Sequence, residues 1–156
     1  MVIQPPVTPE EHRTRTRDAY DALAPVWSAT TDEGPYNGGL ERPALQALVP
    51  SPLTGALVLD AGCGAGALCR WLLDQGADVV GLDLSPRMVD EAVRRCGGRG
   101  TFLVADLAEP LDLEADSIDG ITCSLALHYL EEWGPTLTSF ARILNCLLYT
   151  SPSPRD

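Results

Sequence analysis

The sequence predicts an α/β fold in which a parallel sheet carries helices on both of its faces. Four short apolar runs lie between residues 56 and 123, and the segments that separate the first three show helical periodicity. Such alternation is typical of β-α-β units. The runs are apolar throughout rather than at every second residue, which indicates strands buried on both faces. A charged helical pattern precedes the first run, so we also expect an N-terminal helical cap.

The expected cap comprises residues 1–50. A polar arm over residues 1–8 leads into a helical pattern at residues 10–23. We expect this helix to stop at Pro25, because proline lacks an amide hydrogen and clashes with the preceding turn. A second cap helix is predicted at about residues 40–48.

The first two strands are predicted at residues 56–59 and 79–82, and they end at Asp60 and Asp83. Between them the chain forms a glycine-rich turn and then a helix at about residues 67–73. A glycine follows this helix, as is common at helix ends. These elements make up the first β-α-β unit.

The clearest helical pattern follows the second strand. Ser85 is suited to cap this helix, Pro86 to begin it and Gly97 to end it. Five apolar residues at helical spacing form a stripe along one side. They are Met88, Val89, Ala92, Val93 and Cys96. We expect this stripe to face the sheet.

The last two predicted strands cover residues 101–104 and 118–123, and they lead to Asp106 and Ser124. Three of the four strands thus deliver an aspartate at or just past the carboxyl end. Open parallel sheets bind their ligands at this edge. We therefore expect Asp60, Asp83 and Asp106 to converge on one crevice.

Composition narrows the class of partner. Acidic residues outnumber basic ones by 22 to 11, which gives a net charge of −11 and argues against a large nucleic-acid interface. No apolar run is long enough to span a bilayer, and the first residues lack the features of an export signal. A cytoplasmic protein with a small-molecule ligand is the resulting expectation.

The five cysteines do not form a metal-binding pattern. Their number is odd, no pair has the C-x-x-C spacing, and no histidine is arranged with them for zinc. We expect reduced and mostly buried thiols. They are Cys63, Cys69, Cys96, Cys123 and Cys146. No metal is expected to take part in the chemistry.

The loop after the first strand reads DAGCGAG over residues 60–66 and allows two cofactor hypotheses. Gly62, Gly64 and Ala67 satisfy the G-x-G-x-x-G/A pattern of dinucleotide-binding folds. A dinucleotide would place its pyrophosphate beside the carboxylate of Asp60, which is unfavourable. S-adenosylmethionine has no phosphate, and its sulfonium and ammonium groups are attracted to a carboxylate. The charge therefore favours S-adenosylmethionine.

An ordered series of segments resembles the class I S-adenosylmethionine-dependent methyltransferases. Residues 58–66, VLDAGCGAG, resemble motif I of that family. Residues 80–88, VGLDLSPRM, resemble the segment whose acid binds both ribose hydroxyls and whose methionine packs on adenine. The resemblance implies these roles for Asp83 and Met88.

Two later segments continue the resemblance, which runs from about residue 20 to residue 144. Residues 105–107, ADL, resemble the segment that reads the adenine amino group, with Asp106 as the implied acceptor. Residues 124–129, SLALHY, resemble the segment after the fourth strand, where Ser124 and Leu125 are implied to touch the methionine end.

The cap also resembles this family, over residues 19–27 and 35–37. There, aromatic side chains can fold over the methyl donor and restrict water. Tyr20, Trp27 and Tyr36 are the implied lid residues. The alternative is that they only pack the cap on the sheet, since aromatic residues are common in cores.

The resemblance implies a Rossmann-like fold, S-adenosylmethionine as cofactor and S-adenosylhomocysteine as product. Methyl transfer would proceed by in-line displacement to a small-molecule acceptor that the sequence does not identify. The implied cofactor-binding residues are Asp60, Gly62, Cys63, Gly64, Gly66, Asp83, Leu84, Met88, Ala105, Asp106, Leu107, Ser124, Leu125, Tyr20, Trp27 and Tyr36.

His128 is the candidate catalytic residue, because an oxygen or nitrogen acceptor can require a base and no other histidine is expected near the crevice. The alternative is a packed histidine beside Tyr129. Two other functions stay open. A nicotinamide oxidoreductase is disfavoured by Asp60 and by the lack of any lysine for a Tyr-x-x-x-Lys pair. A non-catalytic module that binds S-adenosylmethionine is the other.

The carboxyl end departs from the family. After residues 140–144 such enzymes usually continue with a basic residue, Pro-Gly-Gly and a fifth strand, whereas residues 145–156 read NCLLYTSPSPRD. Residues 146–156 resemble a translated adaptor of transposase-based sequencing libraries. We expect one incomplete domain over residues 1–145, which lacks its last strands and is inactive alone, and a non-native tail. A natural disordered tail is the alternative.

Overall fold

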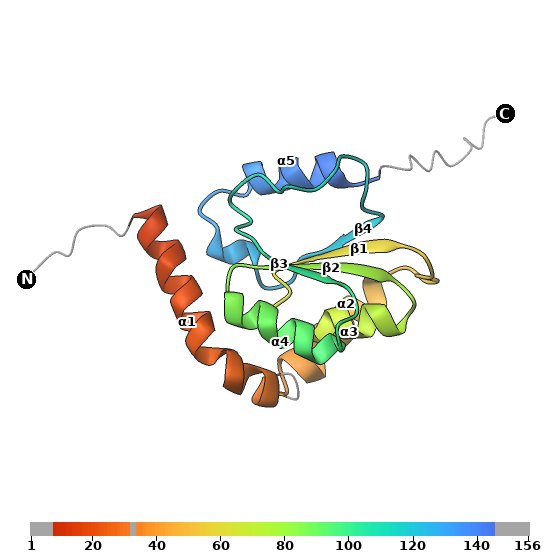
Figure 1. The fold of residues 1–156 in the computed structure, drawn as a ribbon, viewed down its shortest axis with the longest axis horizontal. Helices are drawn as coiled ribbons and strands as arrows, with labels where there is room; N and C mark the ends of the chain where they lie inside the picture. Colours follow the sequence, from red (N-terminus) through yellow and green to blue (C-terminus); the bar gives the residue numbers. More distant parts are fainter. Residues whose placement is uncertain (1–7, 32–33, 146–156) are drawn as a thin grey trace, which may run out of the picture.

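The computed structural model describes residues 8–31 and 34–145. Its four strands form one parallel sheet in the order β3-β2-β1-β4 (Figure 1). The strands are β1 (Leu57–Ala61), β2 (Asp78–Asp83), β3 (Thr101–Val104) and β4 (Gly120–Thr122). The predicted fold class is confirmed.

Helices cover both faces of the sheet. Figure 1 shows α3 (Ala67–Asp74) and α4 (Pro86–Cys96) on one side of the strands and α5 (Gly134–Ile143) on the other. Each face has its own apolar core. Val58 and Leu72 belong to the core under α3, whereas Leu59 and Ile143 belong to the core under α5, where both are fully buried. Alternate residues of β1 therefore serve opposite faces.

Helix α4 has the predicted ends. The hydroxyl of Ser85 accepts a hydrogen bond from the Met88 amide at 3.1 Å, and Gly97 adopts the left-handed conformation that ends the helix. The predicted apolar stripe is buried except at Val93, which is 43% exposed. Val93 lies at the edge of the stripe, because each residue turns a helix by about 100°. That part of the prediction was wrong.

Helix α1 (Pro9–Thr30) continues through Pro25, so the predicted stop at this residue was wrong. A proline inside a helix costs about 3 kcal/mol. Packing on either side of the proline offsets this cost, because Ala24 is buried and Trp27 packs with it around Met88. Pro25 itself lies on the exposed side of the helix.

The second cap helix has two parts. The π-helical turn η1 (Asn37–Glu41) passes directly into α2 (Arg42–Leu48). The predicted helix over residues 40–48 is confirmed, but the π-helical turn before it was not predicted. π-helical turns are rare in proteins, and those that do occur often lie at functional sites.

Strand β4 is shorter than the predicted residues 118–123. Ile118 instead forms an isolated parallel bridge with Leu144, and the amide of Asn145 donates to the Ile118 carbonyl at 2.7 Å. The described chain thus ends beside the segment that leads into β4. The predicted adaptor-like tail, residues 146–156, lies outside the described residues.

Cys63, Cys69 and Cys96 are buried free thiols, and Cys123 is half-buried. Cys146 lies outside the described residues. Across residues 8–31 and 34–145, no three potential metal-ligating side chains are grouped to hold an ion. Over the same part of the chain, the helices are too short or too polar to cross a membrane.

Candidate functional site

A cavity of about 460 Å³ lies at the carboxyl edge of the sheet, between the strand-end loops and the cap. Every predicted site residue except Gly66 lines it, so the predicted convergence of the three aspartates is confirmed. The predicted residues on its wall are Tyr20, Trp27, Tyr36, Asp60, Gly62, Cys63, Gly64, Asp83, Leu84, Met88, Ala105, Asp106, Leu107, Ser124, Leu125 and His128.

The three glycines of the loop have different tasks. At Gly62 a Cβ atom would lie 2.5 Å from the Cβ of Ala126, and φ is +81°. At Gly66, the buried last residue of the loop, a Cβ would lie 2.8 Å from the Cβ of Ala92. Gly66 therefore allows close packing of α4 rather than contact with the cavity. Gly64 lines the cavity, and a Cβ there would meet only open space.

The first amides of this loop donate hydrogen bonds to other groups of the protein. The amides of Gly62 and Cys63 both donate to the Leu82 carbonyl, at 2.8 and 2.9 Å. The Gly64 amide donates to Oδ2 of Asp83 at 2.8 Å. A pyrophosphate is held by free loop amides and a helix N-terminus. These three donors are committed elsewhere, so the loop is poorly suited to a dinucleotide.

Asp83 stands at the end of β2 with its carboxylate held by two amides. Oδ2 accepts from Gly64, and Oδ1 accepts from the Ser85 amide at 2.9 Å. Burial raises the pKa of Asp83, and these two hydrogen bonds oppose the rise. Each carboxylate oxygen keeps a further lone pair for a ligand hydroxyl. The implied contact with the ribose stays a prediction.

Asp60 lies at the floor of the cavity and is only 3% exposed. Its Oδ1 accepts from the Thr122 hydroxyl at 2.8 Å, and its Oδ2 accepts from the Cys69 thiol at 3.1 Å. Burial raises its pKa to about 6. Both oxygens thus already have partners, and the expected attraction to a cationic ligand, directly or through water, stays a prediction.

Asp106 is held by the cap. Its Oδ2 forms an ion pair with Nε of Arg13 on α1 at 3.3 Å, and its Oδ1 accepts from the Ala108 amide at 2.9 Å. The implied contact with an adenine amino group stays a prediction. Arg13 carries no motif signal, because it approaches Asp106 only through tertiary packing.

Aromatic side chains of the cap and of the segment after β4 form part of the cavity wall. The hydroxyls of Tyr20 and Tyr129 are 2.6 Å apart, and Trp27 packs edge-on against Tyr20 with ring centroids 5.5 Å apart. Burial, together with this hydrogen bond, raises the pKa of Tyr20. Tyr20 and Trp27 also pack around Met88, as the packing alternative expects, and their role as a lid stays a prediction. Tyr36 is 61% exposed.

His128 lies in a 3₁₀ turn, η2 (Leu127–Tyr129), and its ring centroid is 4.1 Å from that of Tyr129. It is exposed and lines the cavity. The position suits a base that acts on an acceptor, and this role stays a prediction. Packing against Tyr129, the alternative, is also observed.

Several lining residues were missed by the sequence analysis. They are Thr16, Asn37, Glu41, Arg42, Ala65, Ala67, Leu68, Ala126, Tyr129 and Leu130. Glu41 is notable because its carboxylate accepts a hydrogen bond from the Ser124 hydroxyl. Asn37 lies in the cap segment that resembles the family, whereas Thr16, Glu41 and Arg42 belong to no motif, and their polar character near the expected lid was the signal available.

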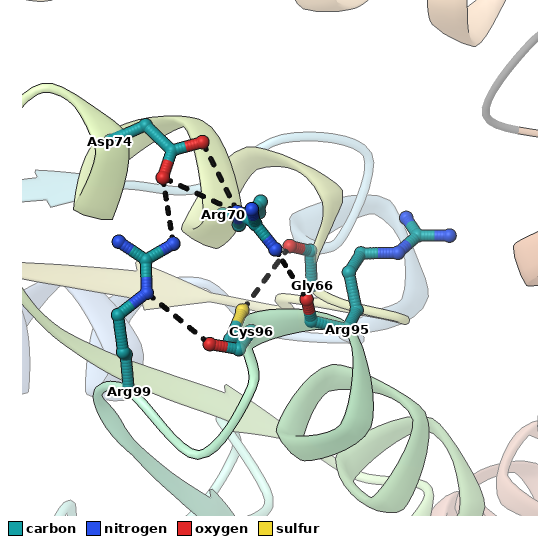
Figure 2. A network of polar contacts seen from close by, with 6 residues as sticks. All are labelled: Gly66, Arg70, Asp74, Arg95, Cys96 and Arg99. Carbon is teal, nitrogen blue, oxygen red and sulfur yellow. Dashed lines mark hydrogen bonds and ion pairs between the residues drawn. The ribbon is translucent and has the colours of Figure 1, made fainter.

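A polar network lies behind the glycine loop and joins α3 to the end of α4 (Figure 2). Arg70 pairs with Asp74 at 3.1 Å and donates to the Arg95 carbonyl at 2.9 Å. Arg99 pairs with the same aspartate at 2.7 Å. The network links α3 to the carboxyl end of α4, the two helices that pack at Gly66. Each exposed ion pair contributes little to stability.

Comparison with known proteins identifies the family. Residues 58–146 match the family model described as "Methyltransferase domain". The chain is 31% identical over 118 residues to a magnesium-protoporphyrin O-methyltransferase of Rhodobacter capsulatus, covering 73% of the chain and 52% of the relative. It is 36% identical over 130 residues to a malonyl-[acyl-carrier protein] O-methyltransferase of Pseudescherichia vulneris, covering 83% and 46%.

A solved structure supports the same assignment. The magnesium protoporphyrin IX methyltransferase of Synechocystis PCC 6803 with bound S-adenosylmethionine superposes with a TM-score of 0.71 at 26% identity, covering 86% of this chain and 72% of that one. The chain spans about half the length of the two curated relatives. It belongs to the methyltransferase domain family and has the α/β fold of the class I methyltransferases.

Proposed function

We propose that the full-length protein transfers a methyl group from S-adenosylmethionine to an oxygen atom of a small-molecule acceptor. The observation that carries this proposal is the commitment of the Gly62, Cys63 and Gly64 amides to Leu82 and Asp83. It leaves a carboxylate-lined cavity that suits a cationic donor better than a pyrophosphate. Both curated relatives are named O-methyltransferases, which supports an oxygen acceptor.

The residues on the cavity wall fit this cofactor. Asp83 is held ready to accept from ribose hydroxyls, and buried Met88 offers an apolar surface for adenine. Asp106 would accept from the adenine amino group. Ser124 and Leu125, which line the cavity after the carboxyl end of β4, would contact the methionine portion. When bound, the cofactor supplies an electrophilic methyl group on a positively charged sulfur.

The cap performs two tasks in this proposal. The hydrogen bond between Tyr20 and Tyr129 joins α1 to η2, and the two rings would exclude water from the centre of the cavity. Methyl transfer gains most of its rate from holding the acceptor oxygen close and in line, so the residues of the cap and η2 would position the acceptor. Where the acceptor is a hydroxyl, His128 would take its proton at a ring nitrogen as the carbon–oxygen bond forms.

The test is a transfer assay with the full-length protein. Purified protein is incubated with S-adenosylmethionine and a panel of oxygen acceptors that includes magnesium-protoporphyrin and malonyl thioesters. Mass spectrometry should detect a methylated acceptor and equimolar S-adenosylhomocysteine. Tight binding of S-adenosylmethionine without any product over a broad panel would instead favour a non-catalytic binding module.

A further inference from the structure

One carboxylate on the cavity wall has no role so far. Asp60, Asp83 and Asp106 stand at strand ends, whereas Glu41 comes from the cap. Glu41 is the last residue of η1, and its amide donates to the Tyr36 carbonyl at 2.9 Å. The π-helical turn thus ends with this side chain at the cavity.

Glu41 reaches the part of the cavity where the methionine portion of the cofactor is expected. Its half-buried carboxylate accepts from the hydroxyl of Ser124, two residues after the end of β4. The next residue, Leu125, has a φ of +52°, which is unusual for a leucine and fixes the direction of the adjoining peptides. The cap and the strand-end backbone therefore meet at Glu41.

Asp60 is less able to meet a cation at this end. It is more deeply buried than Glu41, and Thr122 and Cys69 already donate to its two oxygens. Burial raises the pKa of Asp60, and the negative charges of Asp83 and Glu41 add to the rise, so these carboxylates lie within electrostatic reach of Asp60. Two such groups repel each other, and a cation placed beside them relieves the repulsion.

We propose that Glu41 binds the ammonium group of the cofactor's methionine portion, with the Ser124 hydroxyl holding the carboxylate in place. This inference rests on the proposed function, because it requires S-adenosylmethionine in the cavity. It assigns the carboxylate contact at the methionine end to the cap rather than to Asp60. Cofactor binding would then require the cap segment that also bounds the acceptor space.

The test compares two ligands that differ in the amino acid portion. Glu41→Gln is made in the full-length protein, and dissociation constants are measured by calorimetry for S-adenosylhomocysteine and for 5′-methylthioadenosine, which lacks the ammonium group. We expect the affinity for S-adenosylhomocysteine to fall about tenfold to 100-fold, as for loss of a charge-assisted hydrogen bond. The affinity for 5′-methylthioadenosine should stay unchanged, which also shows that the variant is folded.

The control is Glu132→Gln, a matched substitution at an exposed position, which should alter neither affinity. Equal losses for both ligands in Glu41→Gln would overturn the inference and make Glu41 a structural residue. Unchanged affinity for both would overturn it as well. If the wild-type protein bound neither ligand, the proposed function itself would fail, and this outcome is distinct from the other two.

Discussion

The glycine loop and the cap build opposite walls of one cavity by different means. The loop is shaped by its own backbone, since Gly62, Gly64 and Gly66 have positive φ and the loop amides bond within a few residues of the strand ends. The cap is placed by side chains that meet across long stretches of chain, such as Tyr20 with Tyr129. The turn of the loop is therefore predictable from its glycine pattern, although its amides reach the neighbouring strand β2, whereas the position of the cap depends on the assembled fold.

This difference explains what could be predicted from the sequence. The loop, the strand-end aspartates and both ends of α4 follow from short-range rules of turns, caps and apolar runs. The continuation of α1 through Pro25 did not follow, because it depends on the packing of Ala24 and Trp27 around Met88. Glu41 was missed because only tertiary packing brings the cap to Ser124.

We expect substitutions in the glycine loop to have the largest effects on stability and on cofactor binding. Small effects there would contradict the difference between the loop and the cap. Gly62→Val places a Cβ 2.5 Å from the Cβ of Ala126 at a φ of +81°. We expect destabilisation of about 3 kcal/mol or more, seen as a large drop in melting temperature. Gly64→Val is the matched control, because its Cβ meets open space. It should keep the fold, at a modest strain cost, and abolish cofactor binding.

If Gly62→Val melted like the wild type, the close contact with Ala126 would be wrong. If Gly64→Val bound S-adenosylmethionine normally, the ligand would not lie on this loop. Circular dichroism and calorimetry on the two variants separate these cases.

The buried Asp60 predicts a pH dependence. Burial raises its folded-state pKa from 3.8 to about 6, so between these values the folded protein holds a proton that the unfolded chain has released. The contribution of Asp60 to the free energy of unfolding should therefore decrease as pH rises through this window, by on the order of 3 kcal/mol in total.

Urea unfolding of the wild type and Asp60→Asn at several pH values checks this expectation. The variant should lack this part of the pH dependence, whereas parallel curves would show that Asp60 does not titrate as described. Cofactor affinity measured alongside shows whether Asp60 also acts on the ligand.

Asp83→Ala tests the carboxylate that the loop holds in place. We expect donor binding to weaken by on the order of 2 to 3 kcal/mol, because a charge-assisted contact to the ribose is lost. The Gly64 and Ser85 amides would also lose their acceptor. Calorimetry against S-adenosylhomocysteine gives the value, and Asp78→Ala, at an exposed position of the same strand, is the control. Unchanged affinity in a folded Asp83→Ala variant would remove the assignment.

The smallest effect is expected at the cap. Arg13→Gln removes the partly exposed ion pair with Asp106, which should cost about 1 kcal/mol or less in stability. The measurement is chemical unfolding at low and high salt, with Arg15→Gln as the matched neighbour. A loss of several kcal/mol would show that single cap contacts weigh as much as the loop and would contradict the contrast between the two regions.

The central claim is that this cavity binds S-adenosylmethionine and not a dinucleotide. Calorimetric titration of the protein with S-adenosylmethionine and with NAD, under identical conditions, tests it most directly. We expect saturable binding of S-adenosylmethionine, abolished by Gly64→Val, and no measurable heat from NAD. Saturable binding of NAD, with none for S-adenosylmethionine, would contradict the claim and show that the loop amides are available to a pyrophosphate.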